Sequence, residues 1–309
     1  MTDLRVHALQ PVDRGAAAGL FCAAFPLRAK EVQTWREPPS PTMPRRWVAR
    51  AGRSEEVIAY SALWRLARDG CRMDLVVAPD WRRRGVGGAL LADLEHAAVD
   101  DGMVSMQARA DDCWVESLGF LHSRGFVETM RMHRQVLWVD EADLDPSHSA
   151  ERRLARDGIV VSTLEREEAR EPLCWARFRD LHLVAQDGWV SPDSRPSPDP
   201  ARSPDEFRRR YQRAAAYHGD RPDGCFLAVQ GDRYVGCTGA LGTGVHPAFR
   251  GRGIATALTT RAIEHARMLG VSTLSTSSGN PAMLHINERL GFQRTSTEIR
   301  LVKPLTGNA

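Results

Sequence analysis

Two arginine-glycine segments of this sequence carry residue types that could bind an anion. Residues 245–262 read VHPAFRGRGIATALTTRA, and we expect a helix to begin near Gly253, directly after Arg250 and Arg252. A helix N-terminus already carries about half a positive charge and several unpaired N–H groups. Cations and glycines at this end favour a bound phosphate or pyrophosphate, because glycine lets the anion approach the main chain and arginine adds charge.

The same arrangement occurs earlier in the chain. Residues 77–94 read VAPDWRRRGVGGALLADL, so that Arg82 and Gly85 take the places of Arg250 and Gly253. Two strand-like runs precede each copy, and an amphipathic stretch ending in Gly-Phe follows it. A lone turn of this kind is also typical of an ordinary strand-to-helix connection with exposed arginines. Its repetition in the same context favours the anion site.

The repetition indicates a duplicated domain. Each half is expected to form a strand, one or two helices, three strands, a helix, a strand, a helix and closing strands, which is an α/β fold. We assign residues 1–140 to an N-terminal domain, 141–157 to a polar linker and 158–309 to a C-terminal domain. The length of 309 residues suits this division, because domains of about 150 residues are common.

The composition argues against several other function classes. The 42 basic and 39 acidic residues leave a formal net charge of +3, without the basic face typical of nucleic-acid binding. The six cysteines are scattered, so neither a metal site nor a disulfide framework is expected. No run approaches the ~20 apolar residues of a membrane span, and the N-terminus does not resemble a signal peptide. We expect a cytoplasmic monomer or homodimer that uses no metal and binds neither nucleic acid nor membrane.

With these motifs, the sequence resembles the GNAT superfamily of acetyl-CoA-dependent N-acetyltransferases. The turn of that family reads (Gln or Arg)-x-x-Gly-x-(Gly or Ala), and an Asn-containing loop, a helix and Gly-Phe follow it. Here the second copy continues into NPAMLHINERLGF, residues 280–292. The tandem arrangement is similar to the two-domain bacterial members that include mycothiol synthase. The resemblance implies two tandem GNAT-like domains, each with a mixed sheet splayed between its fourth and fifth strands, where the pantetheine arm of acetyl-CoA or another acyl-CoA lies.

The resemblance also implies which residues contact this co-substrate. In the C-terminal half they are the main chain that pairs with pantetheine and the turn that holds the pyrophosphate: Thr243, Gly244, Val245, Arg250, Gly251, Arg252, Gly253, Ile254, Ala255 and Thr256. Asn280 and Asn287 complete that set. The corresponding residues of the N-terminal half are Leu75, Val76, Val77, Arg82, Arg83, Arg84, Gly85, Val86, Gly87 and Gly88.

Acetyl transfer to an amine needs a deprotonated amine, a polarised thioester carbonyl and a stabilised leaving thiolate. In the family, a backbone N–H of the fourth strand polarises the carbonyl, which points to residues 242–245. A tyrosine commonly meets the thiolate, but this sequence has Asn287 there, which can donate a hydrogen bond without supplying a proton. Asn280 and Asn287 are the candidate catalytic residues. The first half has Trp114 and Leu121 at these positions, so we expect the second half to be catalytic.

The general base and the acceptor are left open. His285, Glu288 and Asp187 are candidates for the base, and a chain of water molecules could serve instead. The expected acceptor is a primary amine of a small molecule that attacks the thioester directly, with residues 186–207 as one wall of its site. Two alternatives remain, a non-catalytic acyl-CoA-binding or sensing protein, which the missing tyrosine favours, and a protein N-acetyltransferase.

Overall fold

The computed structural model describes residues 4–36, 44–52, 56–66, 69–185, 203–218 and 224–305. The chain forms two compact units: unit 1 is Met1–Ala110, Trp114–Thr129 and Ile299–Ala309, and unit 2 is Asp111–Cys113 and Met130–Glu298. Strands β6 (Val127–Trp138) and β12 (Gln293–Pro304) contribute to both units. Helix α4 (Asp145–Arg156) lies within residues 141–157, which the sequence analysis assigned to a linker. The domain limits at residues 140 and 158 remain a prediction.

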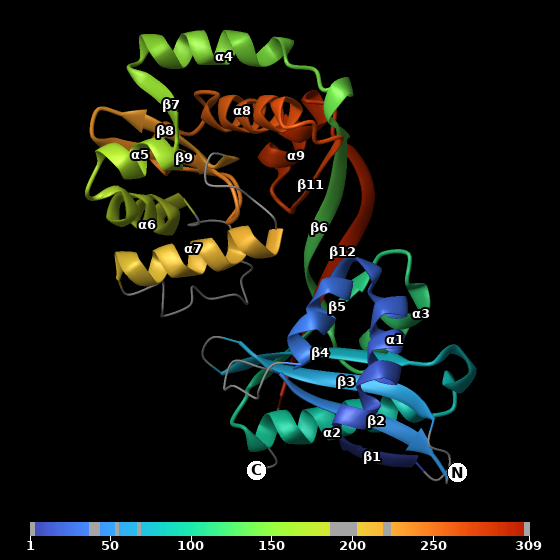
Figure 1. Ribbon diagram of the computed structural model, residues 1–309. Helices are drawn as coiled ribbons and strands as arrows, with labels where there is room; N and C mark the ends of the chain where they lie inside the picture. Colours follow the sequence, from blue (N-terminus) through green and yellow to red (C-terminus); the bar gives the residue numbers. More distant parts are fainter. Residues whose placement is uncertain are drawn as a thin grey trace. The chain divides into compact units, whose positions relative to one another are not determined.

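Unit 1 is built on a mixed sheet with helices on both faces (Figure 1). The first four strands of the sheet pair antiparallel, each with the next. They are β1 (Leu4–Ala8), β2 (Arg45–Ala51), β3 (Val57–Arg65) and β4 (Gly70–Val77). Strand β5 (Ser105–Asp111) follows parallel to β4, and β12 and β6 come after it. The order makes this an α/β unit whose β4 and β5 run in the same direction.

Alternation along the strands gives the two faces of this sheet different partners. Cys71 and Met73 of β4 pack against helices α2 (Val86–Asp100) and α3 (Val115–His122). Val76 of the same strand packs on the opposite face with helix α1 (Arg14–Ala24) and Trp35 of the 3-10 segment η2 (Pro26–Arg36). Arg72 and Asp74 therefore also face α1 and η2.

Unit 2 contains a separate antiparallel sheet in the order β10-β9-β8-β7. Its strands are β7 (Ile159–Thr163), β8 (Phe226–Gln230), β9 (Arg233–Thr238) and β10 (Gly244–Val245). One face packs against helices α5 (Leu164–Arg170), α6 (Cys174–Ala185) and α7 (Pro204–His218). The other face packs against α4 and α8 (Ile254–Met268), which lie side by side in Figure 1. Strand β11 (Thr273–Ser278) pairs with β6, and helix α9 (Pro281–Arg289) contacts both α8 and β11.

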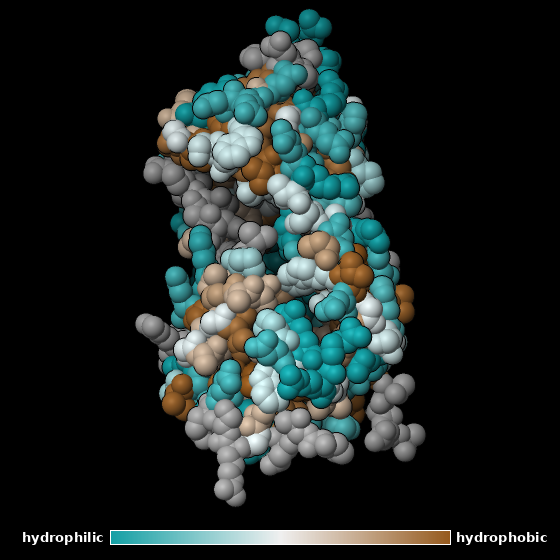
Figure 2. All heavy atoms as spheres, turned by 90° about the vertical axis from the view of Figure 1, so that its right-hand side faces the viewer, coloured by the Kyte–Doolittle hydropathy of each residue, from teal (hydrophilic) through white to brown (hydrophobic). Residues whose placement is uncertain are grey.

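The architecture confirms the predicted fold class, an α/β fold with mixed sheets. Figure 2 shows one face of the molecule, on which hydrophilic and hydrophobic side chains are interspersed. Among the described residues, no helix combines the length and the apolar character that crossing a bilayer requires.

Candidate functional site

In each unit, the pairing of neighbouring strands stops beside the fourth strand of the repeat. In unit 1, β4 pairs with β5 only from Gly70 to Arg72, opposite residues 105–107, although β4 continues to Val77. In unit 2, β10 belongs to one sheet and β11 to another, and the two strands are not paired. The opening therefore follows the fourth strand of each repeat, as the resemblance implies.

In unit 2, Val245 presents main-chain groups to this opening. The N–H of His246 donates to the carbonyl of Val235 on β9 at 3.0 Å. Because successive residues of a strand direct their main-chain groups to opposite edges, the N–H and C=O of Val245 point away from β9. Its carbonyl accepts a hydrogen bond from Arg250 Nε at 3.2 Å. Its N–H has no partner among the described residues and can donate to a ligand that enters the opening.

Unit 1 repeats this geometry. The N–H of Ala78 donates to the carbonyl of Ile58 at 2.9 Å, so the main-chain groups of Val77 point away from β3. The carbonyl of Val77 accepts a hydrogen bond from Arg82 Nε at 3.2 Å. Each repeat thus ends its fourth strand on a main-chain N–H that points away from the preceding strand and has no partner among the described residues.

The helix after each turn begins on a glycine in the left-handed conformation. Gly85 precedes α2 with φ 86° and ψ −12°, and Gly253 precedes α8 with φ 86° and ψ 9°. This conformation costs glycine little and other residues much more. The next N–H groups have no preceding turn to accept their hydrogen bonds: Val86, Gly87 and Gly88 in unit 1, and Ile254, Ala255 and Thr256 in unit 2. Both turns therefore offer main-chain donors to an anion.

The predicted arginines around these turns also contact the protein itself. Arg84 lies over the ring of Trp81 at 5.1 Å, and Arg252 lies over Phe249 at 5.0 Å. Arg250 Nη2 donates to the carbonyl of Ala185 at 3.3 Å. All three guanidinium groups belong to exposed residues, so they border the anion-binding turn and remain in solvent.

Each turn has a further arginine nearby that the sequence analysis missed. Arg124 Nη2 lies 2.9 Å from the position that a Cβ on Gly88 would occupy, and its guanidinium stacks on Phe120 at 4.1 Å. In unit 2, Arg153 Nη2 lies 3.8 Å from the corresponding position on Gly253. Arg124 precedes the closing Gly-Phe of its repeat, whereas Arg153 comes from the predicted linker, where no motif pointed to it.

The two candidate catalytic asparagines have defined structural partners. Asn280 is the N-cap of α9, and its Oδ1 accepts a hydrogen bond from the N–H of Ala282 at 2.9 Å. Asn287 is only 2% exposed, and its Nδ2 donates to Oε1 of the buried Gln135 at 2.8 Å. The Asn287 amide would have to give up this bond or share its second hydrogen to reach a thiolate. The catalytic roles of both residues stay predictions.

Two of the base candidates lie on α9, where His285 and Glu288 are exposed. Asp187, and most of the predicted acceptor wall at residues 186–207, lie outside the described residues. Cys237 of β9 is buried, and this burial raises the pKa of its thiol to about 12 against the opposing effect of the Gly244 N–H. Cys237 is therefore a neutral thiol near neutral pH and a poor nucleophile.

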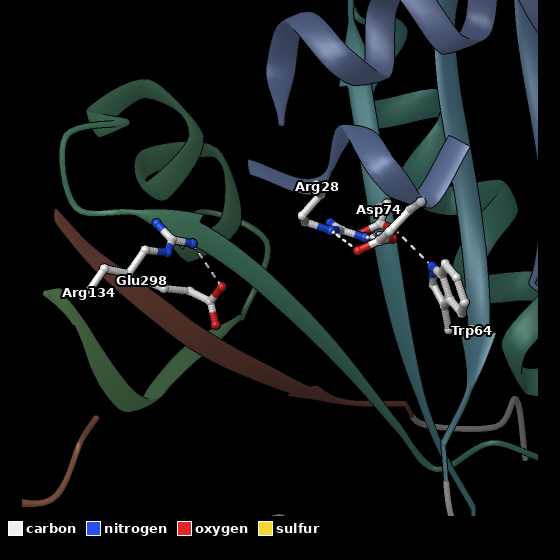
Figure 3. Close-up of polar contacts among 6 residues, drawn as sticks. Arg28, Trp64, Asp74, Arg134 and Glu298 are labelled. Carbon is white, nitrogen blue, oxygen red and sulfur yellow. Dashed lines mark hydrogen bonds and ion pairs between the residues drawn. The ribbon is translucent and has the colours of Figure 1, made fainter. Parts of the chain in front are cut away.

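Unit 1 carries a buried ion pair on the face of its sheet toward η2, which the sequence analysis missed. Arg28 donates from both terminal nitrogens to the Asp74 carboxylate at 2.8 Å. Trp64 Nε1 donates to the same carboxylate at 2.8 Å, and Figure 3 shows both side chains directed at it. Burial acts to raise the pKa of Asp74, but hydrogen bonding and charge from Arg28, with further charge from Arg72, prevail and lower it.

Unit 2 has an ion pair on its long strands. Arg134 of β6 contacts Asp111 and, at 3.1 Å, Glu298 of β12, and Figure 3 shows the Arg134–Glu298 contact. The Arg134 side chain is 24% exposed, compared with 4% for Asp74. The unit 2 pair is therefore better hydrated than the unit 1 pair.

Comparison with known families assigns both repeats to the same group. The model of the acetyltransferase (GNAT) family matches residues 175–292, and that of the acetyltransferase (GNAT) domain matches residues 44–128. A mycothiol acetyltransferase of Geodermatophilus obscurus is 28% identical over 247 residues, which cover 73% of this chain and 71% of that protein.

Two solved structures share the fold over the whole chain. A GCN5-related N-acetyltransferase from Sphaerobacter thermophilus is 18% identical with a TM-score of 0.69, and the match covers 99% of this chain and 97% of that one. A tandem GNAT protein from the clavulanic acid biosynthesis pathway is also 18% identical, with a TM-score of 0.66 and coverage of 99% and 100%. The likeness extends to the tandem arrangement.

Proposed function

Because this chain belongs to the GNAT acetyltransferase family and is a tandem acyltransferase, we propose that it uses acetyl-CoA to acetylate a primary amine of a small molecule. We assign the transfer to the C-terminal repeat. The main observation in support of this assignment is the junction in unit 2 where the unpaired end of β10 leads directly into the Gly253 turn and α8.

The junction offers a donor for each of two parts of the co-substrate. The main-chain N–H groups of residues 254–256 suit the pyrophosphate, with Arg250 and Arg252 beside them. The N–H of Val245 points into the opening between β10 and β11 and suits the thioester carbonyl. One bound acetyl-CoA could use both, since a single short turn connects them.

In the proposed reaction the amine nitrogen attacks the thioester carbon, and the C–S bond breaks. The Val245 N–H stabilises the oxyanion that forms on the carbonyl oxygen. The nitrogen loses its proton to a base that remains open between His285, Glu288, Asp187 and water. The sulfur leaves as a thiolate or takes a proton from solvent, because no described group near Asn287 is proposed to supply one.

The acceptor is proposed from two lines of support. Aspartates in residues 186–207 suit an amine-bearing substrate. A relative is named mycothiol acetyltransferase, so amines related to mycothiol belong in the first acceptor panel.

The decisive experiment follows free thiol release from acetyl-CoA across an amine panel. We expect Gly253→Asp to reduce turnover at least about a hundredfold, equivalent to about 3 kcal/mol, because a carboxylate would occupy the anion-binding turn. Gly253→Ala is the matched control, since it brings the same backbone strain without the charge. We expect it to retain much more activity than Gly253→Asp.

Gly85→Asp is the control for the choice of repeat, because Gly85 has the same φ as Gly253. We expect this variant to keep wild-type turnover while it folds normally by circular dichroism. Equal loss of activity in Gly85→Asp and Gly253→Asp would contradict transfer by the C-terminal repeat alone. Absence of thiol release with every amine would contradict the small-molecule acceptor.

A further inference from the structure

Arg250 joins three main-chain segments of unit 2. Its Nε donates to the carbonyl of Val245 at the end of β10 at 3.2 Å, and its Nη2 donates to the carbonyl of Ala185, the last residue of α6, at 3.3 Å. Arg250 itself follows the 3-10 segment η6 (Pro247–Phe249) and belongs to the turn before α8. One side chain therefore connects the anion-binding turn to the strand and the helix next to it.

The bond to Val245 replaces one that the sheet does not supply. In a continuous sheet, the N–H and C=O that point away from β9 would both pair with the next strand. Strand β10 pairs with β9 through two residues and is not paired with β11. Arg250 satisfies the carbonyl of Val245, and the N–H stays without a partner among the described residues. The edge therefore presents a donor beside an acceptor that is already in use, which suits a ligand carbonyl better than a further strand.

Unit 1 contains the same bond at the corresponding position. Arg82 Nε donates to the carbonyl of Val77 at 3.2 Å, where β4 no longer pairs with β5. In both repeats the arginine follows the valine by 5 residues, and in both the bonding atom is Nε. This nitrogen is the one closest to the backbone, so the bond fixes where the stem of the side chain lies. The repetition indicates that the open end of the fourth strand requires this bond.

The second bond of Arg250 directs its charge toward α6. Ala185 ends this helix, where the last carbonyls have no partner within the helix and the helix dipole favours a cation. The end of α6 lies directly on β10, since a Cβ on Gly244 would be 2.9 Å from that of Ala185. Arg252 of the same turn instead lies over the ring of Phe249. The two arginines of the turn therefore have different surroundings, and Arg250 is the one bonded to the strand.

We propose that Arg250 is a positioning residue, whose Nε bond holds the end of β10 so that the Val245 N–H is directed at the thioester carbonyl. The N–H and C=O of Val245 lie on the same edge of the strand, so holding one sets the direction of the other. Arg250 thus contributes to turnover through its bond to Val245 and not through its charge on the diphosphate. The resemblance implied a direct contact with the co-substrate instead. This role rests on the proposed transfer by the C-terminal repeat.

Three substitutions of Arg250 separate the bond from the charge. The Nε2 of glutamine is as many bonds from Cα as the Nε of arginine, so Arg250→Gln keeps a donor for Val245 and loses the charge. Arg250→Lys keeps the charge, but a methylene takes the place of Nε. Arg250→Met has neither charge nor donor. We expect Arg250→Gln to keep kcat within about threefold of the wild type, and Arg250→Lys and Arg250→Met to lower kcat at least about tenfold.

The KM for acetyl-CoA provides the comparison with the neighbouring arginine. It should change less than about threefold in the Arg250 variants and rise in Arg252→Gln, which removes charge beside the diphosphate. Arg152→Lys, at an exposed position of α4, is the matched control and should have the kcat and KM of the wild type. A kcat retained by Arg250→Lys and lost in Arg250→Gln would assign Arg250 to the diphosphate and overturn the proposal. Wild-type kcat in Arg250→Met, or equal loss in all three Arg250 variants, would also overturn it.

Infrared spectroscopy tests the positioning without turnover. Acetyl-CoA with an isotopic label at the thioester carbonyl is bound to Gly85→Asp protein, in which a carboxylate blocks the turn of unit 1. A hydrogen bond from the Val245 N–H polarises the carbonyl and lowers its stretching frequency. We expect this shift in Gly85→Asp, its retention when Arg250→Gln is added and its loss when Arg250→Lys is added.

An unshifted carbonyl in Gly85→Asp, or an equal shift with Arg250→Gln and Arg250→Lys, would overturn the positioning role. The spectrum needs no acceptor. Absence of thiol release with every amine would therefore contradict the proposed acceptor and leave the result for Arg250 unaffected.

Discussion

The two repeats of this chain have the same main-chain turn and different side chains beside it. Gly85 and Gly253 share a φ of 86°, and the carbonyls of Val77 and Val245 each accept an arginine Nε at 3.2 Å. Beside the opening of the sheet, unit 1 has the buried Arg28–Asp74 ion pair, whereas in unit 2 the described Ala185 lies against Gly244. Anion binding by main-chain amides can persist while side chains diverge, so the turn alone does not tell which repeat is catalytic.

The largest expected effect contrasts the ion pairs of the two units. We expect Asp74→Asn to lower the free energy of unfolding by about 3–4 kcal/mol at pH 7, because the Asp74 side chain is only 4% exposed and Arg28 then keeps only its ion pair with Glu31. Glu298→Gln in unit 2 should cost about 1 kcal/mol, because Arg134 keeps its contact with Asp111 and is better hydrated. Urea unfolding of both variants measures the difference.

The pH dependence of Asp74→Asn checks the cause. The pKa of Asp74 in the folded state lies below its ordinary value, so the pair contributes its full stability above pH ~4 and loses it as the pH falls further. Wild type and Asp74→Asn should therefore converge in stability below pH ~4. A difference that is constant down to pH ~3 would show that packing, not charge, sets the effect.

Sequence reasoning found the turns because their signal is local. A single glycine is enough to indicate a left-handed residue at the start of a helix. The sequence shows this signal twice, at Gly85 and at Gly253. The order of strands around the opening followed from the family resemblance. The contribution of β6 and β12 to both units was not predicted, because alternation identifies a strand without saying which sheet it joins.

The side-chain clusters escaped prediction because their members are far apart in the sequence. Arg28 and Asp74 are 46 residues apart, and Asn287 and Gln135 are 152 residues apart. Arg28 by itself resembles a surface residue of a helical segment, and Asp74 resembles a polar interruption of a strand. Only the packing of η2 on the sheet brings the two together. Asn287 could be aligned with a catalytic position, but its bond to Gln135 could not be inferred.

A second prediction concerns a buried histidine on α6 of unit 2. His182 is 5% exposed and packs on Phe207, and burial, with the charge of Arg210, lowers its pKa to about 4. Between pH ~6.5 and ~4 the unfolded chain binds a proton at this site and the folded chain does not, so acid destabilises the fold. We expect His182 to account for about 3 kcal/mol of stability lost over that interval.

His182→Phe provides the measurement for this prediction, because it keeps the aromatic packing and removes the titration. Its free energy of unfolding should fall less than that of the wild type between pH 7 and pH 4. If the stabilities of His182→Phe and the wild type change with pH in parallel, His182 has the same pKa in the folded and the unfolded chain, which would contradict the prediction.

A third prediction separates the two roles of Asn280, which caps α9 and is also a predicted co-substrate contact. Asn280→Ala should lower the free energy of unfolding by about 1 kcal/mol, and Asn280→Ser should restore most of it, since serine is also a good N-cap. If Asn280 contacts the co-substrate, the KM for acetyl-CoA should rise in Asn280→Ala and should remain above the wild-type value in Asn280→Ser. Recovery of KM together with stability would assign Asn280 to capping alone and contradict the predicted contact.

The smallest expected effect tests how closely the turns match. Arg83 has a φ of 60°, whereas the corresponding residue of the second turn is Gly251 with a φ of 78°. A left-handed arginine costs about 1–2 kcal/mol, and glycine recovers this at an entropic cost of about 0.5–1 kcal/mol. Arg83→Gly should therefore stabilise the protein by about 0.5 kcal/mol, with little loss from the exposed contact to Glu116. Gly251→Ala should destabilise it by about 1 kcal/mol. Thermal unfolding of both variants measures these opposite signs, and a destabilised Arg83→Gly would mean that the Arg83 side chain makes a contribution to unit 1 larger than its backbone strain.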